Sequence, residues 1–151
     1  MNGQDECRAF VLHLLDDHRR LEGKMLRIKH AIDESGDEVT ADTKESICHE
    51  LVSLRKEMAH HFHQEESGGC IEEAVCRCPT LAAEATELEH EHESLLELLG
   101  KSIVLAEGEH DWRKFRATFA DLTQQVLEHE NKENDLIQRG FNTSFDLREQ
   151  C

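Results

Sequence analysis

The stretch WRKFRATFADLTQQVLEHENKENDLIQ, residues 112–138, carries the clearest structural signal in the chain. Its large apolar residues recur at steps of three or four, and His129 and Glu133 fall on the same stripe. A repeat of about 3.6 residues places these side chains on one face of an α-helix. The stretch therefore predicts a long amphipathic helix whose buried face includes two polar groups.

Three further segments show the same period, which predicts an all-α fold. The four expected helices span about residues 6–34, 42–66, 80–107 and 111–138. Short loops at 35–41 and 108–110 make successive helices antiparallel, and segment 67–79 has room for a short helix. We expect one domain, residues 1–151: an up-down-up-down antiparallel four-helix bundle with a short C-terminal tail, Phe141 to Cys151.

Capping residues and glycines mark where the predicted helices begin and end. The expected N-terminal signals are Asp42 with Glu45, then Thr80, then Asp111. The expected stops are Gly36, Gly68–Gly69, Gly108 and Gly140.

Composition excludes several classes of function. Seventeen Lys and Arg against 33 Asp and Glu leave a net charge of −16, which repels nucleic acid and anionic membrane surfaces. No apolar stretch is long enough to span a membrane, and the N-terminal residues do not resemble a secretion signal. We therefore expect a cytoplasmic protein without a nucleic-acid or membrane partner, and six reduced cysteines.

One histidine lies on the apolar stripe of each predicted helix, and two of the four have a glutamate four residues on. Counted from the loops at one end, at about 1.5 Å per residue, all six lie within roughly 9 Å of one height. A buried carboxylate is costly unless it is paired or bound to metal, and imidazole with carboxylate suits iron, manganese or zinc. The set predicts a metal site in the core: His18, His61, Glu65, His92, His129 and Glu133.

The alternative is that each of the four stripe histidines is an ordinary core residue that hydrogen-bonds to a neighbour. This would have to happen independently in every helix and at the same height. The other seven histidines lie off the stripes or at a helix start, and we expect them at the surface. They are His13, His30, His49, His60, His63, His90 and His110, of which His60 and His63 could pick up stray metal.

The pattern His18 … His61-x-x-x-Glu65 … His92 … His129-x-x-x-Glu133 resembles the hemerythrin-like, or HHE cation-binding, family. The resemblance implies a non-haem di-iron centre: two iron ions bridged by both glutamates and by an oxo or hydroxo group. It implies that the first two histidines bind one iron and the last two the other. The ligand count is closest to di-iron proteins that repair iron centres after nitrosative stress, and to the iron-sensing hemerythrin domain of a ubiquitin-ligase subunit.

The chain departs from the oxygen-carrying hemerythrins, which have five histidines. Leu88 stands four residues before His92, where the carriers have a further histidine, and the fourth helix has His129-x-x-x-Glu133 where the carriers have His-x-x-x-x-Asp. Both irons would then keep open or water-filled positions. Reversible oxygen carriage is therefore not expected.

Three more glutamates and three cysteines are candidates for secondary roles. Glu57 and Glu91 match the relative places of glutamates that line the access route to the metals in the repair proteins, and Glu22 follows His18 by four. Each could instead be an ordinary surface carboxylate. The cysteines of segment 67–79 are either redox thiols or loop residues without a role, because their spacing is not that of a thioredoxin motif. They are Cys70, Cys76 and Cys78.

Three functions fit this pattern. The first is a redox-active di-iron protein whose open site binds or reacts with oxygen, peroxide or nitric oxide in a stress response or in iron-centre repair. The second is an iron or oxygen sensor without turnover, whose fold depends on its metal. The third, a bundle with structural zinc, is favoured least, because bridging carboxylates and open coordination positions suit a reactive metal pair better. The sequence leaves open whether the site is enzymatic, and names neither an electron donor nor a protein partner.

Overall fold

The structure is a computed structural model that describes residues 3–142. Within that range it is all-α, without strands, as the sequence predicts. Its elements are α1 (Gly3–Ser35), α2 (Ala41–Glu66), α3 (Cys70–Arg77), a 3-10 helix η1 (Pro79–Leu81), α4 (Ala82–Glu107) and α5 (Trp112–Asn142). The short helix that segment 67–79 has room for is α3. The predicted tail lies outside the described residues from position 143 onward.

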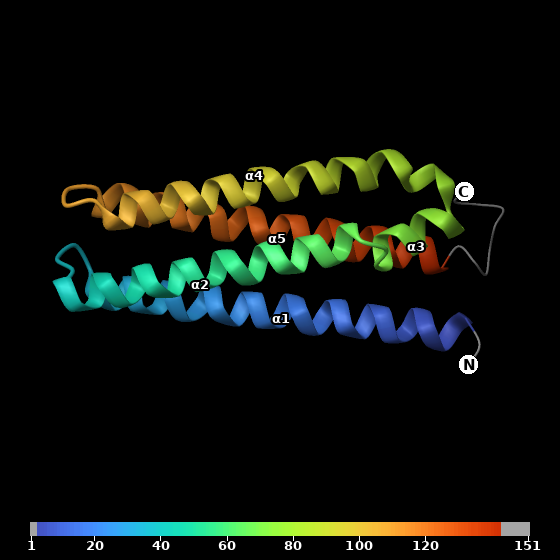
Figure 1. The fold of residues 1–151 in the computed structure, drawn as a ribbon, viewed down its shortest axis with the longest axis horizontal. Helices are drawn as coiled ribbons and strands as arrows, with labels where there is room; N and C mark the ends of the chain where they lie inside the picture. Colours follow the sequence, from blue (N-terminus) through green and yellow to red (C-terminus); the bar gives the residue numbers. More distant parts are fainter. Residues whose placement is uncertain (1–2, 143–151) are drawn as a thin grey trace.

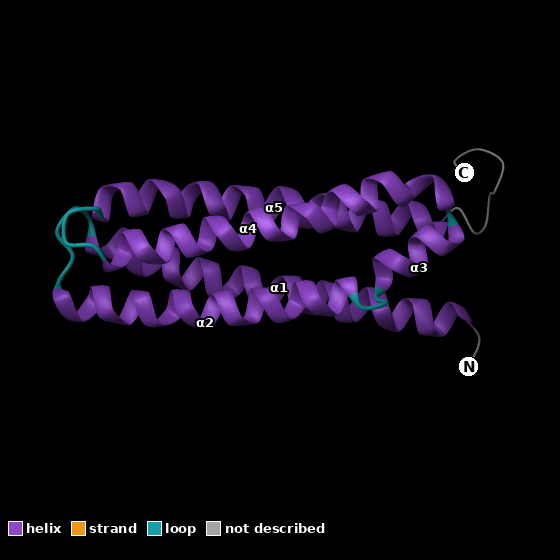
Figure 2. Ribbon diagram, turned by 45° about the horizontal axis from the view of Figure 1, so that its top comes forward, coloured by secondary structure: helices purple, strands orange, loops and turns teal. Residues whose placement is uncertain are grey.

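The four long helices lie side by side and alternate in direction (Figure 1). Helix α1 packs on α2, α2 on α4, α4 on α5, and α5 returns to contact α1. The two loops that join α1 to α2 and α4 to α5 lie together at one end, and α3 lies at the other (Figure 2). The predicted up-down-up-down four-helix bundle is therefore confirmed.

The capping of α2 differs from the prediction. Thr40 is the N-terminal cap: its backbone is extended and its hydroxyl accepts a hydrogen bond of 3.2 Å from the amide of Thr43. Asp42 and Glu45 lie inside the helix, so the predicted capping box is wrong. A threonine with an extended backbone just before the first turn satisfies one of the free amides there, which leaves no role for a later cap.

The start of α4 also differs from the prediction. Pro79 opens a single 3-10 turn, and α4 begins only at Ala82, without a side-chain cap. Thr80 is therefore not the cap; its hydroxyl lies 3.2 Å from the sulfur of Cys78. Asp111 directly precedes α5, and its carbonyl accepts a bond of 2.7 Å from the amide of Phe115.

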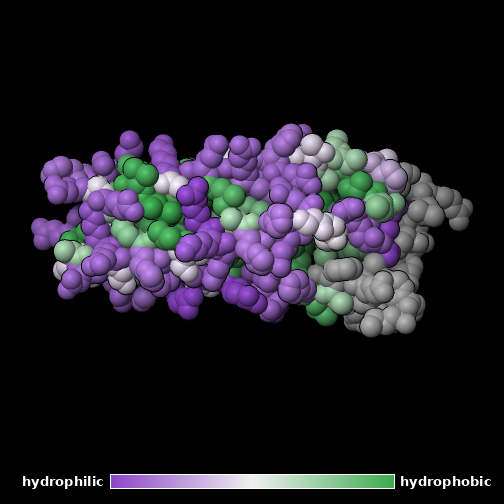
Figure 3. All heavy atoms as spheres, viewed as in Figure 1, coloured by the Kyte–Doolittle hydropathy of each residue, from purple (hydrophilic) through white to green (hydrophobic). Residues whose placement is uncertain are grey.

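The apolar core has two parts. The larger part fills the bundle from the loop end and includes Leu51, Leu99 and Phe115. The smaller part lies under α3 and includes Ile71 and Leu136. Hydrophilic residues cover most of the face shown in Figure 3. Among the described helices, none combines the length and the hydropathy that crossing a membrane requires.

Helix α3 approaches α5 very closely at Gly140. A Cβ atom at this glycine would lie 2.4 Å from the Cβ and 2.8 Å from the Cα of Ala74. Gly140 does not end α5, which continues to Asn142, so the predicted stop is wrong. The glycine is instead what allows the two backbones to pack together.

We expect Gly140→Ala to destabilise the protein by roughly 1–3 kcal/mol because of overpacking against Ala74. The usual preference of helices for alanine, about 1 kcal/mol, works in the opposite direction. Gly23→Ala is the matched control, since nothing lies within 4 Å of a Cβ there, and it should stabilise α1. Urea unfolding of both variants measures the difference. A Gly140→Ala protein as stable as the wild type would contradict this account of the contact.

Candidate metal centre

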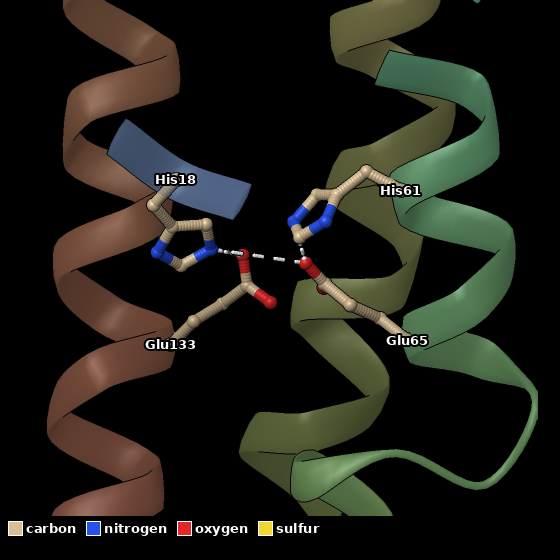
Figure 4. A group of neighbouring side chains, drawn as sticks. All are labelled: His18, His61, Glu65 and Glu133. Atoms are coloured by element: carbon tan, nitrogen blue, oxygen red, sulfur yellow. Dashed lines mark ion pairs between the residues drawn. The ribbon is translucent and has the colours of Figure 1, made fainter. Parts of the chain in front are cut away.

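The six residues predicted as ligands come together in the core. Each is at most 8% exposed, and Glu133 is completely buried. Helix α1 contributes His18, α2 contributes His61 and Glu65, α4 contributes His92, and α5 contributes His129 and Glu133. Figure 4 shows four of them pointing toward one another from three helices. The layer lies between the two parts of the apolar core.

The six residues form two overlapping groups that share both glutamates. Within each group, the possible ligand atoms all lie within 4.8 Å of one another. One group adds His18 and His61 to the glutamates, and the other adds His92 and His129. Each group could hold a metal ion, so the core could hold metal at two adjacent positions.

The carboxylate of Glu65 lies between the two groups. One of its oxygens, Oε2, is 3.2 Å from Nε2 of His92. The other, Oε1, contacts Nε2 of His61 and is 3.8 Å from Nε2 of His18. The two oxygens of one side chain therefore face different histidine pairs, as a bridging carboxylate must.

Glu133 completes the inner layer from the opposite side of the bundle. Its Oε1 atom is 2.8 Å from Nε2 of His129 and 3.8 Å from Nε2 of His18. All four histidines therefore direct Nε2 inward, toward the two carboxylates.

Three of the four histidines direct their other ring nitrogen, Nδ1, toward an outer carboxylate. The pairs are His61 with Asp17 at 3.5 Å, His92 with Glu66 at 3.1 Å, and His129 with Glu91 at 2.9 Å. Outer carboxylates of this kind fix the tautomer and the orientation of metal-binding histidines. Sequence reasoning singled out Glu91 and missed Asp17 and Glu66, although both directly adjoin a predicted ligand.

Phe62 packs against the histidines of the second group. Its ring stacks on His92, with centroids 4.0 Å apart and planes 6° apart, and meets His129 edge-on at 5.7 Å. The stacked ring restricts rotation of the His92 imidazole and shields that side of the centre from water. Its position directly after His61 was the available signal, and sequence reasoning did not use it.

The two inner glutamates shift each other's pKa in opposite directions. Burial, and then the nearby Glu65, raise the pKa of Glu133 well above its ordinary value. Burial also acts to raise the pKa of Glu65, but the neighbouring Glu133 and the surrounding histidines lower it below its ordinary range. The proximity of the two acids therefore favours the protonated form of Glu133, and bound cations would favour the ionised form of both.

Most inner atoms of the layer have no hydrogen-bond partner in the described part of the chain. This holds for Nε2 of all four histidines and for both oxygens of Glu65 and Glu133. Buried polar atoms are usually satisfied, so these inner atoms, most of which make ion-pair contacts but none of which makes a hydrogen bond to a described residue, require an explanation. Imidazole nitrogens and carboxylate oxygens that converge in a dry core fit bound metal ions.

The seven remaining histidines are all exposed, as predicted. Of the secondary glutamates, Glu57 lies outside the layer and pairs with Lys24, whose Nζ is 3.3 Å away. Glu22 is exposed and lies beside Glu130. Glu91 contacts the layer through His129, as described above, and also accepts a bond of 2.9 Å from Lys132.

The cysteines of segment 67–79 do not form one group. Cys76 is free and exposed, and Cys70 is buried in the smaller part of the core. Cys78 is disulfide-bonded, so the expectation of reduced thiols is wrong at this position. None of the three belongs to the buried groups that could hold metal. Cys7 and Cys151 lie outside the part of the chain whose side chains are described.

Glu130 is a buried acid that sequence reasoning missed. It is only 4% exposed, and neither of its oxygens has a hydrogen-bond partner within the described residues. Burial, together with Glu22, raises its pKa to about 10. The signal was its spacing, because it follows Val126 by four residues and so lies on the edge of the apolar stripe.

No protein-family model matches the chain, and neither the curated proteins nor the solved structures include a significant match to it. The buried histidines and glutamates are compatible with a hemerythrin-like site. The function is therefore inferred from the residues and from their geometry.

We expect Glu130→Gln to stabilise the metal-free protein at alkaline pH. A carboxyl whose pKa rises from 4.5 to about 10 on folding must take up a proton at neutral pH. The resulting loss of stability is absent below the unfolded pKa and grows by up to about 1.4 kcal/mol per pH unit above it. The gain in Tm should therefore be large near pH 8 and small near pH 5.

Glu128→Gln is the control for this measurement, because Glu128 is exposed on the same helix. Its effect on Tm should be small at both pH values. A Glu130→Gln protein that is less stable than the wild type at pH 8 would show that the Glu130 carboxylate is ionised and stabilising.

Proposed function

We propose that the protein is a non-haem di-iron protein whose centre reacts with oxygen, peroxide or nitric oxide. The observation that carries the proposal is the position of Glu65, whose two oxygens face two different histidine pairs. A carboxylate placed in this way can bridge two metal ions inside a helical bundle. Glu133 supplies the second shared carboxylate.

The donor set supports iron as the metal. Each position offers two imidazole nitrogens and two shared carboxylates, a mixture that suits redox-active iron and leaves coordination positions open. When bound, an iron pair supplies electrons to a small oxidant. Structural zinc is favoured less, because such sites are usually closed by four ligands of their own.

The protein controls access to this centre. On one side, Phe62 and the outer glutamates cover the second histidine pair. On the other, a pocket of about 300 Å³ is lined by His61 and Glu65. A pocket of this size admits oxygen, peroxide or nitric oxide to the first histidine pair.

A second candidate function is an iron or oxygen sensor without turnover. The observation that favours it is the complete burial of Glu133 beside Glu65. Loss of metal would leave two acids close together in the core, which would loosen the bundle and convert metal binding into a structural signal. Multiple-turnover consumption of peroxide or nitric oxide separates the reactive protein from the sensor.

We expect the wild-type protein, expressed with ample iron, to contain two iron ions per chain. Glu65→Ala and Glu133→Ala should each lower this stoichiometry, because both positions use both carboxylates. Elemental analysis and the optical spectrum of the purified proteins measure metal content and metal type. Unchanged iron in both variants would refute the bridging assignment, and zinc in the wild type would favour the structural alternative.

His92 and His90 provide a matched pair for the same measurement. They are two residues apart on α4, but His92 is 3% exposed and His90 is exposed. His92→Ala should lose metal, and His90→Ala should retain the wild-type amount. The reverse result would exclude His92 as the ligand from α4.

We expect oxygen to oxidise the iron-loaded, reduced protein irreversibly. Two nitrogens and two shared carboxylates leave open positions on both metals, and Leu88, which is buried, supplies no further ligand. Stopped-flow absorbance after mixing with oxygenated buffer follows the reaction. If degassing restores the starting spectrum, the protein is an oxygen carrier and the proposed reactivity is wrong.

A further inference from the structure

A cleft between α1 and α2 leads from the surface to the metal centre. It consists of two adjoining pockets of about 300 and 180 Å³, which share four lining residues. The shared residues are His13, Asp17, His61 and Gln64. The smaller pocket is also lined by His60, and the larger one reaches Glu65. We call these two pockets together the α1–α2 cleft.

Metal-binding groups follow one another down this cleft. Nε2 of His13 lies 3.5 Å from Oδ2 of Asp17, and the same oxygen lies 3.5 Å from Nδ1 of His61. The exposed fractions of the three side chains fall from 68% to 15% to 6% along this series. An ion bound at the surface by His13 and Asp17 would therefore already be next to His61, because Asp17 contacts both histidines.

The inner end of the cleft is a buried histidine whose nitrogens make ion-pair contacts with Asp17 and Glu65 but no hydrogen bond to any described residue. His61 lines both pockets, is only 5% exposed, and has no hydrogen-bond partner for either nitrogen within residues 3–142. Both oxygens of Glu65, which lines the larger pocket, also have none. The cleft therefore ends on donor atoms that are available to a cation.

The pockets on the α4–α5 side of the bundle differ in chemistry. Both are lined by carboxylates and Lys132, and one of them also by Arg139. No histidine of the described residues lines either pocket. Among the described residues that line the α1–α2 cleft, Arg20 is the one lysine or arginine. It is 66% exposed and lies 3.9 Å from Asp17. A divalent transition-metal ion, for which imidazole is a suitable ligand, is therefore favoured on the α1–α2 side.

We infer that the α1–α2 cleft is an uptake site for a divalent transition-metal ion. His13 and His60 at the surface, with Asp17 below them, capture the ion and pass it to His61 and Glu65. The net charge of −16 attracts cations to the surface, and the cleft concentrates them beside the centre. The inference rests on the proposed function, because it requires that the buried layer binds metal.

The test is the rate of metal uptake by the metal-free protein, with anaerobic Co²⁺ as a redox-stable probe. Stopped-flow absorbance of the cobalt bands follows the filling of the centre. The wild-type rate should saturate as the Co²⁺ concentration rises, because capture precedes transfer. In the His13→Ala/His60→Ala double variant, the rate at limiting Co²⁺ should fall by about tenfold, because both imidazoles that hold the ion at the surface are lost and the loss of a supporting residue commonly lowers metal affinity roughly 10- to 100-fold.

The final cobalt content and spectrum of this variant should equal those of the wild type, because neither histidine belongs to the buried layer. The control is His63→Ala/His90→Ala, which removes two exposed histidines outside the cleft. It should load at the wild-type rate. Equal rates in the two double variants would overturn the uptake site while leaving the metal centre intact.

A lower final cobalt content in His13→Ala/His60→Ala, with an unchanged rate, would also overturn the inference, since these histidines would then hold metal permanently. If the wild type takes up no cobalt into the buried layer, both the proposed function and the uptake site fail. The final cobalt content therefore tests the metal centre, and the loading rate tests the uptake site.

Discussion

The burial of Glu65 and Glu133 side by side in the core is the constraint on which the rest of the structure depends. Within the described residues, their ion-pair partners are histidines alone, without lysine or arginine. Two acids in a dry core cost several kcal/mol unless positive charge compensates them. In the metal-free state the neighbouring histidines compensate the acids in part, and against the effect of burial Glu65 raises the pKa of His92, whereas two divalent cations would neutralise both acids.

The bundle is built to hold this polar layer in place. Antiparallel helices bring ligands from four distant points of the chain to one height, and apolar side chains seal the layer on both sides. Helix α3 covers the smaller part of the core, where it packs closely against α5 at Gly140. The outer carboxylates then orient the imidazoles, so that the histidines are directed inward before any ion arrives.

Periodicity predicted the fold and the six inner residues because both depend on which side of a helix faces the core. Periodicity could not show which residues beside the apolar stripe of a helix contact the site, because the direction of such a side chain depends on its rotamer and on its neighbours. Asp17, Glu66 and Phe62 were missed for this reason. Gly140 was misread as a helix stop, because only the packing of α3 on α5 reveals that the position must lack a side chain.

The two candidate metal positions are not equivalent, and the asymmetry bears on how the proposed centre would work. The pair formed by His18 and His61 adjoins the α1–α2 cleft, whereas the ring of Phe62 covers the pair formed by His92 and His129. Glu65 contacts both pairs, so an ion that arrived through the cleft would meet the first position before the second. The shared carboxylate then offers a direct route from one position to the other. In the proposed centre, the shielded position would fill through the open one, and the open one would stay next to solvent, where a small reactant could reach it.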